Sequence, residues 1–397
     1  MKMERKVTII IPTFNDVNLF RIVLEAISNQ TILPHELIVV DSSTDNSIQN
    51  LIESSSYKFN IRHEKTLSRI FPYEATNLGV KLTSTEWVAF LDTKTIPTSE
   101  WLEKYFKIIT QENLDIIFGV TKYLASSSYQ RLLRDSTYGK LGHETAPGSI
   151  MRKNDFLDSG SIIEGVRSAG DIEWRSHLKS MKYKWVTPEQ VFLSYDDLPY
   201  SLLPTVKKFF IYQLHGARVN AQRKIKDVYY VLALLLSAII IPRWNPIVGW
   251  EKSSLYMPNV TKIYLLALLV FLLSTFLINR VIFKSTTNSN LFINTLKALI
   301  FLFLFLGVYN WNAVLAGWVE DSVWYIPHIT KIYIGLIILA SVLYRGILFP
   351  LRHGVKSGDI FPLRWVKIGL LGLMLDIVKA PGYVIGGIVM PFIKKRN

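Results

Sequence analysis

The stretch VTIIIPTFN, residues 7–15, begins with a run of β-branched residues and ends in polar turn residues after Pro12. The same pattern recurs in ELIVVDSSTDNS, residues 36–47, and in WVAFLDTKTIP, residues 87–97, whose apolar runs end at Asp41 and Asp92. Short apolar runs bounded by turn residues are typical of buried strands. We therefore predict three buried strands, each followed by a polar side chain at its carboxyl end.

Helical spacing of apolar residues separates these runs. It predicts helices over residues 19–27, 47–53 and 101–109, a loop followed by a helix over residues 69–82, and a fourth strand over residues 114–120. Strands that alternate with helices favour an α/β fold in which a largely parallel sheet is covered on both faces. Ligands bind such sheets in the crevice outside the carboxyl ends of the strands, so Asp41 and Asp92 are candidate ligand-binding residues.

The motifs at these strand ends resemble family 2 of the inverting glycosyltransferases, which have the GT-A fold. IIPTFN at residues 10–15 is similar to the family's IIPTYN, and ELIVVDSSTDNS is similar to its EIIVVDDGSTDNS, one residue shorter. Gln30 matches a glutamine that usually precedes the second strand, and NLG at residues 77–79 resembles the family's RNxG, with Thr76 where arginine is common. GDIEW at residues 170–174 resembles EDxE(L/W), with Gly170 in place of the first acid. The resemblance covers about residues 6–190 and implies a GT-A domain that handles a sugar nucleotide.

For the donor side, the resemblance implies that Asp41 contacts the nucleotide base while Pro12 and Thr13 shape the slot around it. Asp41 can accept hydrogen bonds from a base imide or a ribose hydroxyl, each contributing about 1.5–3 kcal/mol when the acceptor is charged. The alternative is that Asp41 only caps the helix that starts near Ser47. For Asp45 we favour the capping interpretation.

Asp92 stands where the family usually has DxD, two carboxylates that hold Mg²⁺ or Mn²⁺ against the nucleotide diphosphate. Here the second acid is Lys94, which removes an oxygen ligand and adds a cation. Two hypotheses follow: Lys94 itself neutralises the departing diphosphate without an essential metal, or Asp92 still holds Mg²⁺ together with oxygens of the substrate. We favour the first, so a metal cofactor stays possible but uncertain.

Asp171 is the candidate catalytic base. Inverting transfer requires a carboxylate that takes the proton of the acceptor as its oxygen attacks the anomeric carbon. The alternative is that Asp171 is the N-cap of a helix over residues 172–181, with Glu173 in the first turn. Glu173, Trp174 and, more weakly, Arg152 are predicted on the acceptor side of the site.

The composition changes after residue 228. The whole chain has 397 residues, of which 50% are hydrophobic, and its mean hydropathy is +0.25. Since about 20 apolar residues cross a bilayer, we predict membrane spans at about residues 228–244, 262–280, 298–319 and 328–348. Residues 366–393 are predicted as an interfacial or re-entrant segment, and we favour a helix that lies at the surface. A packed soluble helical domain is the alternative.

The predicted plan is a GT-A catalytic domain over residues 1–200, a basic amphipathic linker over 201–227 and an all-α transmembrane domain over 228–397. The chain carries 45 Lys+Arg against 31 Asp+Glu, a net charge of +14, and its basic residues gather on one side of the predicted spans. The positive-inside rule therefore predicts an integral protein of the cell membrane with a cytoplasmic catalytic domain in contact with membrane lipids. The chain has no cysteine, which excludes disulfides and thiolate chemistry. Its predicted catalytic domain shows no basic helix with interleaved aromatics that would indicate nucleic acid.

The leading hypothesis is a membrane-bound inverting glycosyltransferase for cell-surface polysaccharide or glycolipid synthesis. It would move a hexosyl or related group from a nucleotide-sugar donor to a lipid-linked or glycan acceptor at the cytoplasmic leaflet. A polyprenyl-phosphate glycosyl synthase and a non-catalytic nucleotide-sugar-binding partner of a polysaccharide assembly complex are alternatives. A processive synthase is disfavoured, because its QxxRW motif has Phe361 in place of glutamine before Arg364 and Trp365. The enzymatic hypotheses require Asp41, Asp92 and Asp171 to share one cavity.

Overall fold

A computed structural model describes residues 6–219, 240–260, 262–264, 266, 311, 320–327 and 329–389. The chain forms two compact units, one made of residues 1–222, 342–375 and 385–397, the other of residues 223–341 and 376–384. These units do not follow the predicted boundaries at residues 200 and 228, because segments near the C-terminus belong to the first unit.

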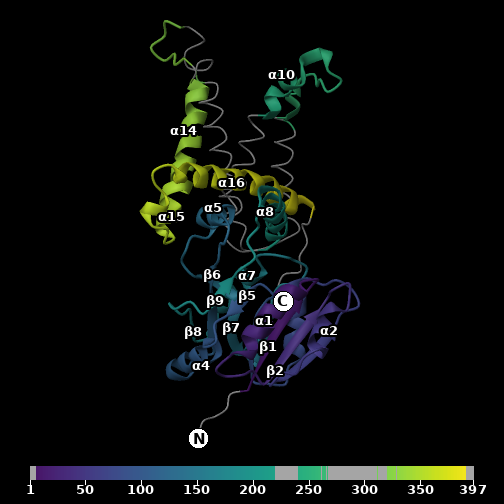
Figure 1. Cartoon of the computed structure of the whole chain (residues 1–397). Helices are drawn as coiled ribbons and strands as arrows, with labels where there is room; N and C mark the ends of the chain where they lie inside the picture. The colour runs from purple at the N-terminus through teal and green to yellow at the C-terminus, as the bar shows by residue number, and fades with distance from the viewer. Residues whose placement is uncertain are drawn as a thin grey trace. The chain divides into compact units, whose positions relative to one another are not determined.

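The first unit is built on one mixed sheet of nine strands. Its strands are β1 Val7–Thr13, β2 Glu36–Asp41, β3 Asn60–Lys65, β4 Trp87–Phe90, β5 Thr95–Pro97, β6 Ile116–Tyr123, β7 His143–Arg152, β8 Trp185–Val186 and β9 Leu193–Tyr195. Their order is β3-β2-β1-β4-β7-β6-β9-β5, with β8 beside β6 (Figure 1). The pairs β1–β2, β2–β3, β1–β4, β6–β8 and β6–β9 are parallel, whereas β4–β7, β6–β7 and β5–β9 are antiparallel. The predicted α/β fold with a mostly parallel sheet is confirmed.

Helices cover both faces of this sheet, as expected from fully apolar strands. They are α1 Val17–Ser28, α2 Ser47–Glu53, α3 Pro72–Leu82, α4 Trp101–Glu112, α5 Ser128–Thr137, α6 Lys153–Asp158, α7 Gly170–Ser180 and α8 Leu202–Gly216. Because side chains alternate along a strand, Ile9 and Ile11 pack with α1, α2 and α4, while Ile10 packs on the opposite face with α3, α6 and α7. A Cβ on Gly79 would lie 2.4 Å from Cγ2 of Ile10, so glycine in the NLG motif lets α3 approach β1.

The sheet curls at its β5 end. β5 follows β4 along the chain but pairs with β9 at the far side of the sheet, and it packs near α1. Gln30 closes this corner: its side chain donates to the backbone oxygen of Thr98 (2.7 Å) and accepts from the backbone N–H of Leu102 (3.2 Å). Gln30 is therefore a buried residue that links the end of α1 to the start of α4 through hydrogen bonds to the backbone.

The last helix of the described chain packs partly on the first unit. A π-helical turn Tyr344–Leu348 leads into α15 Phe349–Arg352, and α16 spans Arg364–Val389. Leu371 and Leu375 of α16 form a buried cluster with Leu133 of α5, and Phe209 of α8 packs against it (Figure 1). The segment predicted as interfacial or re-entrant over residues 366–393 is thus one continuous helix as far as Val389, not a re-entrant pair.

The second unit contains α10 Trp244–Val248 and α14 Ile329–Leu343. Among the described residues, one helical stretch, Gly335–Arg352, is long and apolar enough to cross a membrane, with a mean hydropathy of 1.5 and 17% of it buried. It overlaps the span predicted at residues 328–348. The spans predicted at residues 228–244, 262–280 and 298–319 lie largely outside the described residues. A single helix of this kind is weak support for a membrane domain.

Candidate functional site

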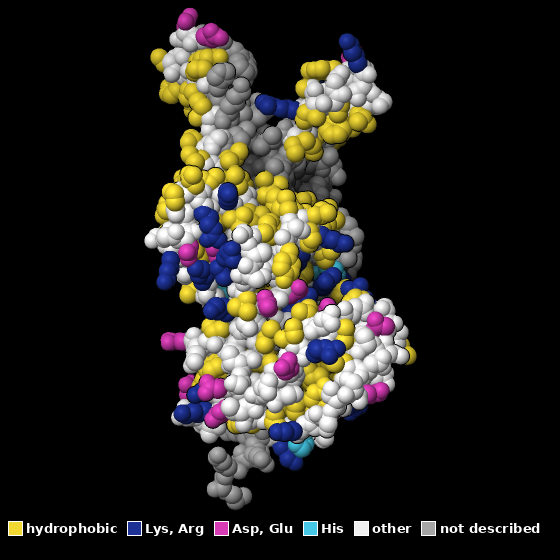
Figure 2. Space-filling model, in the orientation of Figure 1, with side chains coloured by type: hydrophobic (Ala, Val, Ile, Leu, Met, Phe, Trp, Pro, Cys, Tyr) yellow, Lys and Arg dark blue, Asp and Glu magenta, His cyan; other side chains and the backbone are white. Residues whose placement is uncertain are grey.

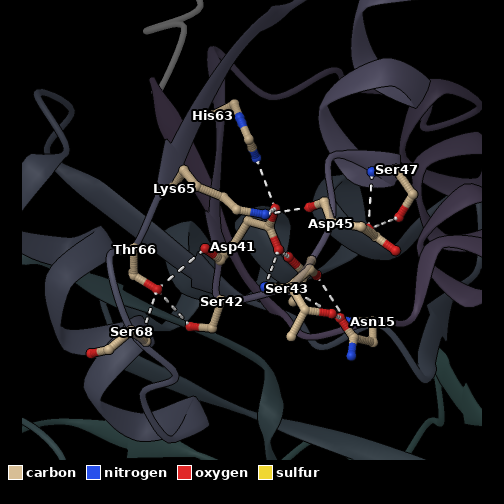
Figure 3. A network of polar contacts seen from close by, with 12 residues as sticks. Asn15, Asp41, Ser42, Ser43, Asp45, Ser47, His63, Lys65, Thr66 and Ser68 are labelled. Carbon is tan, nitrogen blue, oxygen red and sulfur yellow. Dashed lines mark hydrogen bonds and ion pairs between the residues drawn. The ribbon is translucent and has the colours of Figure 1, made fainter.

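The carboxylate of Asp41 lies at the end of β2 in a dense polar network (Figure 3). Its Oδ1 accepts hydrogen bonds from Thr13 Oγ1 (3.0 Å) and from the backbone N–H of Ser43 (2.8 Å). Its Oδ2 lies 3.0 Å from Lys65 Nζ and 3.2 Å from His63 Nε2. Burial alone would raise the pKa of Asp41, but the hydrogen bonds from His63, Ser43 and Lys65 outweigh it and hold the pKa far below its ordinary value.

This network limits what Asp41 can do directly. The side chain is completely buried, and a carboxylate has about four acceptor sites, which the four protein donors occupy. A base imide would have to displace Lys65 or His63 to reach it. The alternative that Asp41 caps α2 is wrong, because α2 begins after Asn46. The N-cap residue is Asn46; Asp45 stands one position before it and accepts from the backbone N–H of Ser47, the first residue of the helix (3.0 Å).

Lys65 and His63 are site residues that the sequence did not reveal. They lie on β3, which pairs in parallel with β2 so that Lys65 stands opposite Asp41. The sequence of β3, NIRHEK, has no apolar run, because it is an edge strand and gains its place from pairing. Lys65 comes opposite Asp41 through the parallel pairing of β3 with β2, and no local pattern in the sequence predicts that pairing.

The turn after β1 joins this network to the next strand end. Asn15 has φ +53° and donates its backbone N–H to Ser43 Oγ (2.8 Å), while Asp16 Oδ2 accepts from Thr93 Oγ1 (3.2 Å). Pro12 and Thr13 end β1 between these contacts, opposite Val40 and Asp41. β1 lies between β2 and β4, so Asp41 and Asp92 are separated by two strand spacings, about 10 Å.

Asp92 and Lys94 lie in the turn between β4 and β5. Asp92 Oδ1 accepts the backbone N–H of Lys94 (2.9 Å), and Lys94 Nζ lies 2.5 Å from Asp197 Oδ2. Burial raises the pKa of Asp92, opposed by hydrogen bonds from Thr95 and Lys94. The pKa of Lys94 is raised, because its bond to Asp197 outweighs the effect of burial.

These residues fit a divalent cation poorly. An ammonium stands at the position of the second acid, and the described residues contain no group of three His, Asp or Glu side chains that could hold a metal. Hard cations such as Mg²⁺ prefer several oxygen ligands, and a neighbouring cation opposes their binding. The reaction proposed for this site therefore uses no metal ion.

Asp171 lies in the first turn of α7 and is partly exposed. Its Oδ1 accepts from the hydroxyl of Tyr73 (3.1 Å), and its Oδ2 lies 3.5 Å from Arg175 one turn later. The helix begins at Gly170 with Ala169 as N-cap at φ +65°, so the interpretation of Asp171 as N-cap is wrong. A Cβ on Gly170 would lie 2.7 Å from the ring of Tyr73; the glycine that replaces the motif's first acid makes room for the ring that holds Asp171.

The charges of Asp92 and Asp171 both affect the pKa of Tyr123, which lies in a group of tyrosines. After burial, the charges of Asp171 and Asp92 are the largest causes that raise the pKa of Tyr123. The Tyr123 ring stacks on Tyr138 with 3.8 Å between centroids, and Tyr195 lies 5.2 Å from it. The charges of both acids thus reach Tyr123, while Asp41 lies beyond β1 in its own network. That all three acids share one cavity stays a prediction.

Two residues predicted on the acceptor side lie elsewhere. Arg152 pairs with Trp87 at the start of β4, about 16 Å along the strand direction from the end that carries Asp92. Antiparallel β7 brings its beginning, not its end, toward Asp171. Trp174 is completely buried against Phe90, Phe118 and Phe156. Glu173 does lie beside Asp171 in the first turn of α7.

Glu144, rather than Arg152, is the charged residue of β7 that pairs with α7, the helix that carries Asp171. It lies near the start of β7 and bridges Arg175 (2.7 Å) and Lys179 (2.6 Å) of α7. These hydrogen bonds outweigh burial and hold the pKa of Glu144 below its ordinary value. Arg175 therefore joins Glu144 to Asp171 and positions the carboxylate proposed as base.

Comparison with known proteins agrees with the motifs. Residues 8–163 match the model of Glycosyl transferase family 2. This segment contains Asp41 and Asp92 but ends before Asp171. Chondroitin synthase of Escherichia coli is 26% identical over 178 residues, which are 44% of this chain and 24% of that protein. Glycosyltransferase AglE of Haloferax volcanii is 22% identical over 193 residues, 45% of this chain and 62% of that protein.

A poly(ribitol-phosphate) β-N-acetylglucosaminyltransferase, TarP of Staphylococcus aureus, is 27% identical over 118 residues, 29% of this chain and 36% of that protein. A crystal structure of S. aureus TarS 1–349 with UDP-GlcNAc covers 60% of this chain and 72% of its own, with 17% identity and a TM-score of 0.39. The chain spans less than two thirds of each of these three curated relatives. The family match and the relatives support a glycosyltransferase.

Proposed function

We propose that this chain transfers a sugar from a nucleotide-sugar donor to a lipid-linked or glycan acceptor, with inversion at the anomeric carbon. The family match over residues 8–163 carries the proposal. The charges of Asp92 and Asp171 both raise the pKa of the buried Tyr123, and this agrees with a donor-side and an acceptor-side acid near one another. The UDP-GlcNAc complex of TarS concerns that protein, and we extend nucleotide-sugar binding to this chain as part of the proposal.

The proposed reaction is one displacement. The acceptor hydroxyl oxygen bonds to the anomeric carbon as the bond from that carbon to the diphosphate oxygen breaks. Asp171 takes the hydroxyl proton, and the nucleoside diphosphate leaves with the bonding electron pair. Tyr73 and Arg175 hold the Asp171 carboxylate in place, and Lys94 offsets the negative charge that develops on the diphosphate.

A second candidate is transfer to a polyprenyl phosphate. Both oxygens of Asp171 already contact protein donors. A phosphate acceptor is ionised and needs no base, so it would react without displacing these contacts. The dependence of turnover on Asp171 separates this candidate from the first. The further alternative, a non-catalytic nucleotide-sugar-binding partner, predicts binding without turnover.

We further propose that the reaction takes place at the cytoplasmic leaflet of the cell membrane. The apolar stretch Gly335–Arg352 supports this, as do large exposed apolar side chains of α14 such as Leu336, Ile338 and Leu339 (Figure 2). Basic side chains gather over the region of α5 and α15 (Figure 2), and basic segments beside a membrane are attracted to anionic lipid. The membrane would then present the lipid part of the acceptor.

The test is turnover of UDP-, GDP- and dTDP-sugars by the membrane-embedded chain and its Asp171→Asn variant. We expect a loss of about 10²–10⁴-fold in turnover with nucleotide binding retained. Asp158→Asn is the matched control, because Asp158 is an exposed acid at the end of α6. Unchanged turnover in Asp171→Asn would remove the base and favour the phosphate acceptor. Nucleotide binding without turnover of any donor by the unaltered chain would favour the non-catalytic alternative.

A further inference from the structure

Lys208 is a cation without an anionic partner among the described residues, and it contacts Tyr195, which stands opposite Thr95, the residue after Lys94, in the pairing of β9 with β5. It lies on α8, in the segment predicted as a surface linker, and points between two tyrosine rings. Its Nζ donates to the hydroxyl of Tyr195 (3.1 Å) and lies 5.2 Å from the Tyr195 ring centroid and 5.7 Å from that of Tyr212. No ion pair found within the described part of the chain includes Lys208, and Asp197, which lies near it, is bonded to Lys94.

The surroundings of Lys208 are basic as well as aromatic. Burial lowers the pKa of Lys208 to about 8, with Lys94 and Arg167 lowering it further and Asp197 and Asp92 opposing them. Arg167 precedes Ser168, whose hydroxyl donates to the backbone oxygen of Tyr212 on α8 (2.5 Å). At neutral pH Lys208 is therefore mainly charged, in a site where an unpaired charge costs free energy.

An anion would remove this cost. A phosphate group has several strong acceptor oxygens, and its bonds to ammonium groups are charge-assisted. Lys94 would contribute a second ammonium by exchanging Asp197 for the ligand, since both partners of that pair are about one third exposed. A carboxylate ligand would have fewer oxygens to share between two lysines on different elements.

We propose that Lys208 and Lys94 form a binding site for a phosphate group, in which Asp197 holds Lys94 while the site is empty. The proposal rests on the proposed function, because it names the contacts of a phosphate at the same site. Two sources supply that chemistry: the diphosphate of the donor and the phosphate of a lipid-linked acceptor. Two lysines from the β4–β5 turn and from α8 then provide the charge that a metal ion would otherwise provide.

The test measures anion binding by the full chain in detergent, in buffer with EDTA, by titration calorimetry. Inorganic pyrophosphate represents the donor's diphosphate, and farnesyl phosphate represents a lipid phosphate, with farnesol as the probe without phosphate. Lys208→Met is compared with Lys207→Met, which removes the same charge from the adjacent, exposed residue of α8. Lys208→Arg keeps the charge and serves as the conservative variant.

We expect Lys208→Met to raise the Kd of one phosphate probe by about 10- to 100-fold, Lys207→Met to change it less than about twofold, and Lys208→Arg to restore most of the affinity. Weakening of pyrophosphate assigns the site to the donor, and weakening of farnesyl phosphate assigns it to the acceptor. Equal affinity of Lys208→Met and the unaltered chain for both phosphate probes overturns the proposal. So does equal weakening of farnesol, which would indicate a general loss of the site. Binding does not require turnover. If the unaltered chain shows no turnover and Lys208→Met still weakens pyrophosphate binding, the transferase proposal is refuted and the phosphate site is supported.

Discussion

The ion pair between Asp135 and Arg364 joins the start of α16 to α5 within the first unit, and its strength can be measured. Asp135 lies on α5 with its side chain 1% exposed. Its Oδ2 accepts from Arg364 of α16 at 2.7 Å, and its Oδ1 accepts from Arg134 at 3.1 Å. Arg364 also donates to the backbone oxygen of Asp359 (2.7 Å). Replacing Arg364 leaves a buried carboxylate with one partner, which is costly in a medium of low dielectric constant.

We expect Asp135→Asn and Arg364→Gln each to lower the free energy of unfolding by about 2–4 kcal/mol. The double variant should lose less than the sum, with a coupling energy of about 1.5–3 kcal/mol, the range for a hydrogen bond between charged groups. For a unit of this size, about 1 kcal/mol shifts Tm by about 2–4 °C, so each single variant should melt several degrees lower. The assay is a double-mutant cycle on thermal and denaturant unfolding of the detergent-solubilised chain.

The chain offers a matched control between the same parts of the molecule. Lys140 Nζ lies 2.5 Å from Asp359 Oδ2, but the two side chains are 34% and 43% exposed. Exposed pairs typically couple by about 0.2–1 kcal/mol, so burial, not distance, is the variable that the two cycles compare. A coupling energy for Asp135–Arg364 no larger than that for Lys140–Asp359 would refute the argument that α16 docks through a buried charge.

Three further predictions concern the site and its core. Excess EDTA should leave turnover within about twofold if Lys94 offsets the diphosphate charge, whereas complete loss would point to Asp92 and Mg²⁺. The pKa of Asp41 is lowered in the folded chain, so its charge contributes stability that is present above the unfolded pKa, near 4, and is lost as pH falls through the lower folded pKa. In acid titrations of the unfolding free energy, Asp41→Asn should therefore show a shallower fall below about pH 5. An unchanged slope would contradict this. Trp174→Ala should lower the unfolding free energy by about 3–5 kcal/mol. Trp185→Ala is the control and should lower it by less than half of that, because Trp185 is 39% exposed. Equal losses would place Trp174 outside the core.

The elements read correctly from the sequence are those whose burial is written into a local pattern. β1, β2 and β4 are built on buried apolar runs; β1 and β2 end at Thr13 and Asp41, and β4 ends at Phe90, two residues before Asp92. The helices α1 to α4 followed from apolar residues three and four apart. In both cases the signal lies within one element, because side-chain spacing along a strand or helix decides which face is buried.

The strands that the sequence missed, β3, β5, β8 and β9, are short or polar and form through pairing with distant strands. No local pattern marks them. The same limit explains Arg152, because only the antiparallel pairing of β7 with β4 puts it at the far end of the sheet. Trp174 was expected either to pack or to line the acceptor pocket, and it packs in the core against Phe90, Phe118 and Phe156.

The sequence by itself determined the α/β fold, the strand ends that carry Asp41 and Asp92, and the first turn that carries Asp171. The tertiary structure alone decided which of these meet: Asp92 and Asp171 act on Tyr123, while Asp41 is enclosed by Lys65 and His63. It also decided that α16 packs on α5 and that Lys208 comes beside Lys94. The physical reason is that periodicity records whether a residue is buried, whereas the partner of a charge depends on strand order, strand direction and docking between segments far apart in the chain.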